Sequence, residues 1–441
     1  MSHELLQNVR ILDPESGTDT IADILIKEGV INAIQTNLSP SSDVEVQDAK
    51  GLILGPGLVD LYSHTGEPGF EERETISSLI DAATAGGFTR IALLPDSIPP
   101  VDNPATVSLI DRLAQTKSSC QVYLWGALTQ GVAGKQMSQL AELATTKIIG
   151  FADGKPIQDL MLLRRLLEYL KPLNQPVALY GCDRQLASNG VMREGNESIL
   201  SGLPGIPAYA ETTAISTILE IVAATQTPVH LMRVSTARSV ELIREAKARK
   251  LPITASTTWL HLLLNTQAIS GKNKSLPFSM IPYDPNLNLD PPLGNIEDQI
   301  ALIQGVKSGV IDAIAIDHTP YTYEEKTVAF ADAPAGSIGL ELALPLLWQT
   351  FVSSGQWSAL ELWQALSTKP LKCLGQKPTR IANGKPAELT LFSPQTPWKV
   401  EAKTLNSLSI NTSWLRQDIT GKVLKTYRND FGLDSEMFRI D

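Results

Sequence analysis

Eight short apolar segments, rich in β-branched residues, recur along the middle of this 441-residue chain and are separated by helical patterns. Strands that are buried on both faces read as near-continuous apolar runs, and their alternation with helices indicates a parallel sheet covered by helices. Eight such units predict an α/β fold, a closed (β/α)8 TIM-type barrel. The predicted strands are 57–65, 88–95, 121–129, 147–153, 176–181, 228–235, 251–257 and 311–317. The predicted helices include 75–86, 158–170, 211–225, 237–249, 297–308 and 338–352.

The two ends of the chain follow a different pattern. Residues 5–55 and 380–425 alternate apolar and polar side chains and are interrupted by turn signals, which is typical of antiparallel β structure. We therefore expect a small β-sandwich domain built from residues 1–55 and 375–441 together. Residues 56–374 would form the barrel domain.

The composition limits which binding partners and which cellular compartment we expect for the protein. The formal net charge is −10, whereas binding to phosphate backbones needs clustered Lys and Arg, so we expect no nucleic acid partner. No apolar run approaches the ~20 residues that span a bilayer, and the start of the chain lacks a basic stretch followed by an apolar one. The three cysteines are widely spaced without a CxxC pair. These features predict a cytoplasmic protein with no membrane association.

Chemistry in such barrels is located at the carboxyl ends of the strands. A strand that ends in His-x-His would present two imidazoles on one side, ready to chelate a metal. Here the first strand ends in Tyr62 and His64 instead. The polar or unusual residues at the predicted strand ends are Tyr62, His64, Gly66, Asp96, Asp153, Tyr180, Asp183, Arg233, His261, Asp317, His318 and Tyr321.

Several strings make a resemblance specific. They include PGLVDLYSHTGEPGFEERETI, LPDSIPPVDNP, GLPGIPAYAE, VSTARSVELIREAK and LDPPLGNIEDQIALIQGVKSGVIDAIAIDHTPYTYEEK. From about residue 5 to residue 395 the chain resembles the dihydroorotases of the amidohydrolase superfamily. The resemblance implies the barrel-plus-small-domain fold of that superfamily. It also implies pyrimidine (UMP) biosynthesis and a hydrolase centre that holds one or two zinc ions.

The resemblance also implies where the zinc ligands would lie. The His-x-His pair falls on Tyr62 and His64, and the bridging carboxylate falls on Asp153. The two later histidines fall on Tyr180 and Arg233. The aspartate that acts as ligand and general base falls on Asp317, the one candidate catalytic residue. Three ligand positions are therefore retained as a vestigial metal site, His64, Asp153 and Asp317, and three are lost, Tyr62, Tyr180 and Arg233.

Positions that would hold the substrate are altered as well. The arginine and asparagine that grip the substrate carboxylate in the family fall on Gly66 and Asp96. A further asparagine falls on Asp290, a late histidine on Tyr321, and a loop arginine on Gly294. Removing a bidentate arginine and adding carboxylates would weaken binding of an anionic substrate.

The replacements are poor zinc ligands for physical reasons. The Tyr62 phenol has an unperturbed pKa of about 10, and Arg233 is a permanent cation without a lone pair to donate. Two buried carboxylates, Asp153 and Asp317, would need a compensating positive charge. We therefore expect the Arg233 guanidinium to substitute for the metal electrostatically and to hydrogen-bond one or both of them.

The remaining histidines have simpler interpretations. His230 lies inside a strand and is interpreted as a core residue. His261 is interpreted as a packing residue, because Trp259 and Leu260 fill the neighbouring positions. His318 is expected to have a supporting or structural role.

Three functions stay open at this point. The first is a catalytically inactive dihydroorotase-like protein, a pseudoenzyme without a cofactor that acts as a structural partner of aspartate transcarbamoylase, as the resemblance implies, with a homo-oligomer as a further possibility. The second is an active zinc-dependent cyclic amidohydrolase. It would convert dihydroorotate and water to carbamoyl aspartate with one zinc on His64, Asp153 and Asp317. The third is a binding module that uses the emptied pocket for an anion.

Overall fold

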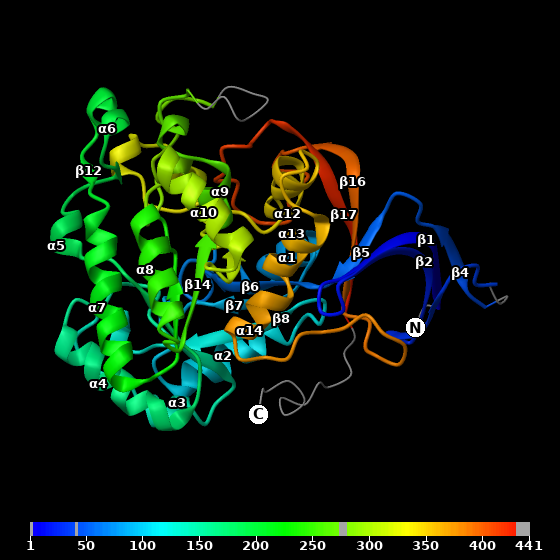
Figure 1. The fold of residues 1–441 in the computed structure, drawn as a ribbon, viewed down its shortest axis with the longest axis horizontal. Coiled ribbons are helices and arrows are strands. Elements are labelled where there is room, and N and C mark those ends of the chain that lie inside the picture. Colours follow the sequence, from blue (N-terminus) through cyan, green and yellow to red (C-terminus); the bar gives the residue numbers. More distant parts are fainter. Residues whose placement is uncertain (1–2, 40–42, 273–279, 429–441) are drawn as a thin grey trace.

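The structure is a computed structural model that describes residues 3–39, 43–272 and 280–428. Residues 429–441 of the predicted small domain therefore lie outside the described residues. A barrel and a separate sheet lie side by side, with strands β1, β2 and β4 on the flank away from the barrel helices (Figure 1). Over the described ranges, no helix combines the length and the apolar character that crossing a membrane requires.

The barrel contains eight parallel strands in chain order around the sheet, which confirms the predicted fold class. Each predicted apolar run coincides with one strand. The strands are β6 (Leu58–Ser63), β7 (Phe88–Leu93), β8 (Gln121–Gly126), β9 (Ile148–Ala152), β10 (Val177–Tyr180), β13 (Val229–Met232), β14 (Ile253–Thr258) and β15 (Ala313–Ala315). The first and last strands meet through backbone bonds. Asp317 N donates to Tyr62 O at 3.1 Å, and His64 N donates to His318 O at 2.8 Å.

Amphipathic helices cover the outside of the barrel. The longer ones are α1 (Ile76–Ala85), α2 (Pro104–Ala114), α4 (Leu160–Leu170), α7 (Tyr209–Thr225), α8 (Ala237–Ala248), α10 (Ile296–Ser308) and α13 (Ala359–Leu366). Shorter ones are α3 (Leu140–Leu143), α5 (Arg184–Ala187), α6 (Asn196–Ser201), α9 (Trp259–Leu263), α11 (Tyr323–Lys326), α12 (Ala343–Leu347) and α14 (Thr368–Cys373). Side-chain caps start several of them, as Thr75 does for α1 by accepting from Ser78 N.

The predicted helix 338–352 is too long at its start. Helix α12 begins only at Ala343, and a π-helical turn follows over Trp348–Val352. The amides of Gly339 and Leu340 instead donate to Nδ1 of His318, at 3.2 and 3.5 Å. A short two-stranded ribbon, β11 (Met192–Arg193) with β12 (Gly205–Ile206), also lies outside the barrel sheet.

Both chain ends build the second sheet, as the alternating patterns predicted. It has seven strands in the order β17-β16-β5-β1-β2-β3, with β4 also paired to β1. Most pairs are antiparallel, but β1 runs parallel to β4 and β5. The strands are β1 (Glu4–Asp13), β2 (Thr18–Lys27), β3 (Val30–Gln35), β4 (Glu45–Asp48), β5 (Ile53–Pro56), β16 (Leu389–Lys399) and β17 (Asp418–Tyr427). Their alternating apolar side chains form a core of their own, which includes Leu6, Val9 and Ile24.

A buried ion pair ties this sheet to the barrel. Arg90 on β7 donates from Nε and Nη2 to the two oxygens of Glu388, each at 2.7 Å, and from Nη1 to Gln376 at 2.8 Å. Arg90 and Glu388 are 2% and 5% exposed. A bidentate pair at this depth fixes the orientation of the two parts, because separating them would leave two uncompensated charges.

Candidate functional site

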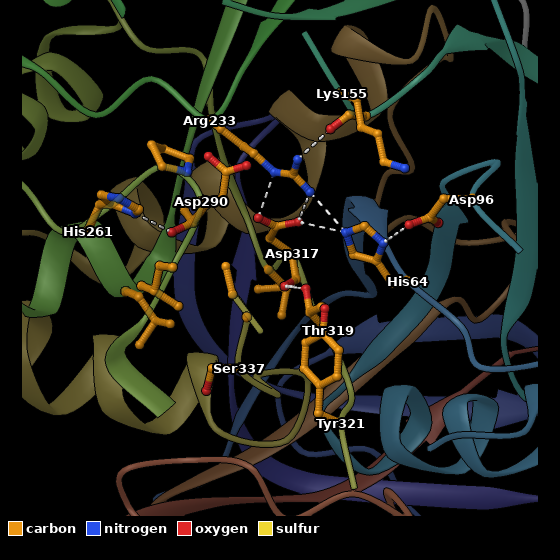
Figure 2. Close-up of a pocket in the computed structure, with 18 of the residues that line it drawn as sticks. His64, Asp96, Lys155, Arg233, His261, Asp290, Asp317, Thr319, Tyr321 and Ser337 are labelled. Carbon is orange, nitrogen blue, oxygen red and sulfur yellow. Dashed lines mark hydrogen bonds and ion pairs between the residues drawn. The ribbon is translucent and has the colours of Figure 1, made fainter. Parts of the chain in front are cut away.

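A cavity of about 260 Å³ opens at the carboxyl ends of the barrel strands. Polar side chains from the loops after six of the strands surround it (Figure 2). They include His64, Asp96, Asp153, Lys155, Arg233, His261, Asp290, Asp317 and Tyr321. The cavity lies at the strand ends where the sequence analysis put the site, and its lining includes the retained positions and three of the altered ones, namely His64, Asp153 and Asp317 with Asp96, Asp290 and Tyr321.

Arg233 lies at the centre of the polar groups and is 5% exposed. It follows β13, and its Nε and Nη2 donate to the two oxygens of Asp317 at 2.8 and 2.6 Å. Nη1 donates to Gly154 O at 2.7 Å, and Nη2 lies 3.0 Å from Nε2 of His64. Figure 2 shows the guanidinium, the Asp317 carboxylate and the His64 imidazole in contact with one another. The expected compensation of a buried carboxylate by this cation is therefore present at Asp317.

His64 joins a chain of alternating charges. Its Nδ1 is 2.7 Å from Asp96 Oδ2, and its Nε2 is 3.6 Å from Asp317 Oδ1. Burial by itself lowers the pKa of His64, but the two flanking carboxylates outweigh burial and raise it to about 9. Burial raises the pKa of Asp317, and Arg233 with His64 more than reverses this and lowers it to about 2. The imidazole and the guanidinium thus both lie against Asp317, and Asp96 holds the other ring nitrogen of His64.

Asp153 is satisfied without Arg233. Its carboxylate accepts from Leu128 N at 2.8 Å, Thr129 N at 3.1 Å and Thr129 Oγ1 at 2.5 Å. Of the two carboxylates considered for compensation, only Asp317 receives the guanidinium. Backbone amides in the loop after β8 already donate to Asp153. This depends on the loop conformation, which the sequence does not indicate.

Both tyrosines at lost ligand positions are neutral hydrogen-bonding groups. The Tyr62 hydroxyl accepts from Arg233 N at 3.0 Å and pairs with Ser256 Oγ at 2.9 Å. The Tyr180 hydroxyl donates to Asp290 Oδ1 at 2.6 Å. Burial is the largest cause that raises the pKa of each phenol above its ordinary value. Neither can offer a phenolate to a metal near neutral pH.

The residues at the altered substrate positions contact other groups of the protein. Gly66 packs so closely that an added Cβ would lie 2.1 Å from Phe70 O, so the loop in this conformation excludes any side chain there. Asp290 is paired with Arg184 and with Tyr180, and Asp96 with His64. Both carboxylates expected to disfavour an anionic substrate thus have partners inside the protein, Arg184 for Asp290 and His64 for Asp96.

Tyr321 connects the loop after β15 to the neighbouring loop after β6. Its ring lies 5.0 Å from the Arg73 guanidinium and 5.3 Å from the Lys326 ammonium. Arg73, from the loop after β6, also forms an ion pair with Glu325 on α11. The loop that carries the late family histidine position is thus held by cation–aromatic contacts.

Sequence reasoning missed three charged side chains, those of Lys155, Arg184 and Glu74. Lys155 lines the cavity, and Arg184 pairs with Asp290 from α5. Glu74 is fully buried and accepts from Leu408 N at 3.1 Å, and from the hydroxyls of Ser78 and Ser407. Glu74 lies inside the first matched string, but a single sequence gives no sign of its partners.

The other histidines have structural surroundings. His230 pairs with Thr254 and Ser256 inside the barrel, and burial lowers its pKa to about 3. His261 pairs with Thr258 Oγ1 at 2.7 Å, and burial lowers its pKa to about 4. His318 accepts from Gly339 N at 3.2 Å, as expected for a supporting residue.

The residues present do not fit a zinc ion. His64, Asp153 and Asp317 line one cavity, yet each directs its polar atoms at protein partners. Across residues 3–39, 43–272 and 280–428, no three His, Cys, Asp or Glu side chains form a group that could hold a metal ion. The Arg233 guanidinium, in contact with both His64 and Asp317, would also repel a divalent cation between them.

Comparisons with known proteins agree with the fold and the strings. A family model described as "Dihydro-orotase-like" matches residues 51–239. The chain is 43% identical to a "Probable dihydroorotase-like protein" of Synechocystis sp., over 96% of this chain and 99% of that protein. It is 36% identical to a "Dihydroorotase" of Pelobacter propionicus, over 96% of this chain and 97% of that protein.

Solved structures support the same architecture. An L-hydantoinase (dihydropyrimidinase) from Arthrobacter aurescens superposes with a TM-score of 0.81 at 21% identity, over 97% of this chain and 94% of that chain. At that identity the match concerns the fold alone. Taken with the two curated relatives, the fold and the matched strings show that this chain belongs to the dihydroorotase-like family.

Proposed function

We propose that this protein is a noncatalytic member of the dihydroorotase-like family that serves pyrimidine biosynthesis as a structural partner of aspartate transcarbamoylase. The observation that carries the proposal is the Arg233 guanidinium, which pairs with both oxygens of Asp317 and contacts Nε2 of His64. A general base must have a free lone pair near the proton it removes, and a metal-bound water needs an open coordination position. The mouth in this arrangement offers neither.

The pattern of replacements supports loss of chemistry with retention of the scaffold. All eight barrel strands and the second sheet are kept, while ligand and substrate positions changed together. The changed residues also bind one another, as Tyr180 does with Asp290. A fold kept intact around an altered mouth suits a protein whose surface matters more than its cavity. Aspartate transcarbamoylase is proposed as the partner from the family resemblance.

The competing function is a zinc-dependent cyclic amidohydrolase with a mononuclear site. Two observations favour it: relatives at 34–36% identity bear the name dihydroorotase, and His64 and Asp317 still face one cavity. In that function Arg233 would have to swing out of the cavity before zinc could bind. The reaction would be hydrolysis of dihydroorotate to carbamoyl aspartate.

A direct experiment separates the two functions. The full chain is purified without chelators, its zinc content is measured, and turnover of dihydroorotate is assayed with and without added zinc. We expect substoichiometric zinc and no turnover above that of an Asp317→Asn variant. Stoichiometric zinc with turnover that Asp317→Asn abolishes would establish the amidohydrolase instead.

The structural role is tested by association. The chain is mixed with the aspartate transcarbamoylase from the same genome, and the mass of the assembly is measured by size-exclusion chromatography with light scattering. We expect a complex whose mass exceeds that of either component. Separate elution of the two proteins at concentrations up to about 10 μM, where a specific complex should be populated, would reject the partnership.

A further inference from the structure

We infer that the Arg233 guanidinium takes the structural place of a metal ion in this barrel and crosslinks the strand ends, so that the mouth is held together without any metal. The inference deepens the noncatalytic function proposed above and rests on it in one respect, since both require a metal-free mouth. It adds a structural role for Arg233, which a noncatalytic protein would not need to have.

The contacts of Arg233 join four strands. The residue follows β13, and its side chain reaches Asp317 after β15, Gly154 O after β9 and Nε2 of His64 after β6. A metal ion in a barrel mouth performs the same mechanical task, because its ligands come from several strand ends. The planar guanidinium can do so because it has five donors in a fixed fork.

The other two lost ligand positions complete the site around this cation. The Tyr62 and Tyr180 rings lie 5.6 and 5.5 Å from the guanidinium carbon, within the range of a cation–π contact. The Tyr62 hydroxyl also accepts from Arg233 N at 3.0 Å. The three replacements are therefore one cluster, in which two aromatic rings and one carboxylate surround one arginine.

The charge of the cluster is permanent and buried. The side chains of Arg233 and Asp317 are 6% and 14% exposed, and they form a bidentate pair. The bidentate guanidinium binds both oxygens of the carboxylate and places a fixed positive charge beside it. Without Arg233 the carboxylate would be a buried charge with only His64 to balance it.

The backbone conformation of Arg233 and Asp317 is a second observation that supports the inference. Arg233 and Asp317 both have φ of +54°, in the left-handed region that non-glycine residues avoid. Such conformations persist where surrounding contacts over-determine them. Two partners of one ion pair share this feature, which fits an ion pair that keeps both loops in place.

Thermal unfolding tests the inference directly. The melting temperature of the wild-type chain should change by less than about 1 °C on adding EDTA or excess zinc, because the residues that the structure describes form no group that could hold the ion. Arg233→Met should lower it by about 5 °C, since one partner of a buried pair is lost. The matched control is Arg238→Met, which removes an exposed arginine paired with Glu241 and Glu245 on α8, and it should shift the melting temperature by about 1 °C or less.

A double variant keeps the test decisive if Arg233→Met fails to fold. Arg233→Met/Asp317→Leu removes both charges, and it should be more stable than Arg233→Met alone because no orphaned carboxylate remains. A double variant no more stable than the single one, an Arg233→Met shift equal to that of Arg238→Met, or a zinc-induced rise in the wild-type melting temperature would each overturn the inference. Failure to bind aspartate transcarbamoylase would reject the proposed function and leave these melting temperatures unchanged.

Discussion

Tyr180 donates its hydroxyl to Asp290 Oδ1 at 2.6 Å, across a separation of 110 residues in the chain. In the family resemblance one position belongs to the metal and the other to the substrate. In this protein the two side chains satisfy each other, and Arg184 completes the group with an ion pair to Asp290. The altered positions are therefore adapted to one another and to the interior of the protein.

The Tyr180–Asp290 bond should contribute to stability. Tyr180→Phe removes a hydrogen bond to a charged acceptor, and we expect the free energy of unfolding to fall by about 1.5–3 kcal/mol in a urea titration. Tyr209→Phe is the control, because that side chain is 54% exposed at the start of α7 and should cost less than about 0.5 kcal/mol. Equal losses for the two variants would show that the bond to Asp290 contributes nothing specific.

Restoring imidazoles should restore metal binding without restoring turnover. In the triple variant Tyr62→His/Tyr180→His/Arg233→His, we expect about one zinc or more per chain, because three neutral lone-pair donors replace two phenols and a cation. Dihydroorotate hydrolysis should stay at background, because Gly66, Asp96 and Asp290 are unchanged. The single variant Arg233→His is the comparison and should stay substoichiometric. A zinc-free triple variant, or one that turns over substrate, would contradict this reading of the positions.

Stability should depend on pH through His64. Asp96 and Asp317 raise the pKa of His64 to about 9, above its ordinary value of 6.5. A pKa raised on folding stabilises the protein fully below pH 6.5, and that contribution disappears as the pH rises through 9. The stability difference between wild type and His64→Gln should therefore shrink by about 1–3 kcal/mol between pH 6 and pH 10, measured by denaturant titration. A constant difference over this range would mean that the imidazole is neutral throughout.

The junction between barrel and second sheet should be sensitive to charge removal. Arg90→Met leaves the buried Glu388 without its bidentate partner, and we expect a loss of about 3–5 kcal/mol in unfolding free energy. Arg90→Met/Glu388→Leu should recover part of the loss. If the loss of unfolding free energy in the double variant equals the sum of the losses in Arg90→Met and Glu388→Leu, the two residues are not energetically coupled across the junction.

Much of the fold could be predicted from local patterns. Near-continuous apolar runs indicated the eight parallel strands, and alternating patterns at residues 5–55 and 380–425 indicated the second sheet. The exception was 338–352, where Gly339 and Leu340 bind His318 in place of continuing a helix. The contact with His318 joins residues about twenty positions apart, so it cannot be predicted from helix periodicity, which reflects neighbours within a few residues.

The location of the candidate site could be predicted from the sequence, but its hydrogen bonds and ion pairs could be predicted only in part. Strand ends at one edge of a barrel must meet, so Tyr62, Arg233 and Asp317 were expected near each other, and they are. Which carboxylate would receive the guanidinium was open, and the structure pairs it with Asp317 while Thr129 serves Asp153. The partners of Asp96 and Asp290 were not foreseen.

The residue types in this sequence determined by themselves that the barrel would form, and the family resemblance implied that six positions at its strand ends would carry only three metal-binding side chains. Only the tertiary structure decided how the other charges are balanced, including the choice of Asp317 over Asp153 and the pairing of Asp290 with Arg184 and Tyr180. The physical reason is range. Strand and helix patterns arise from neighbours within a few residues, whereas ion pairs at a barrel mouth depend on loop conformations that bring together side chains far apart in the chain.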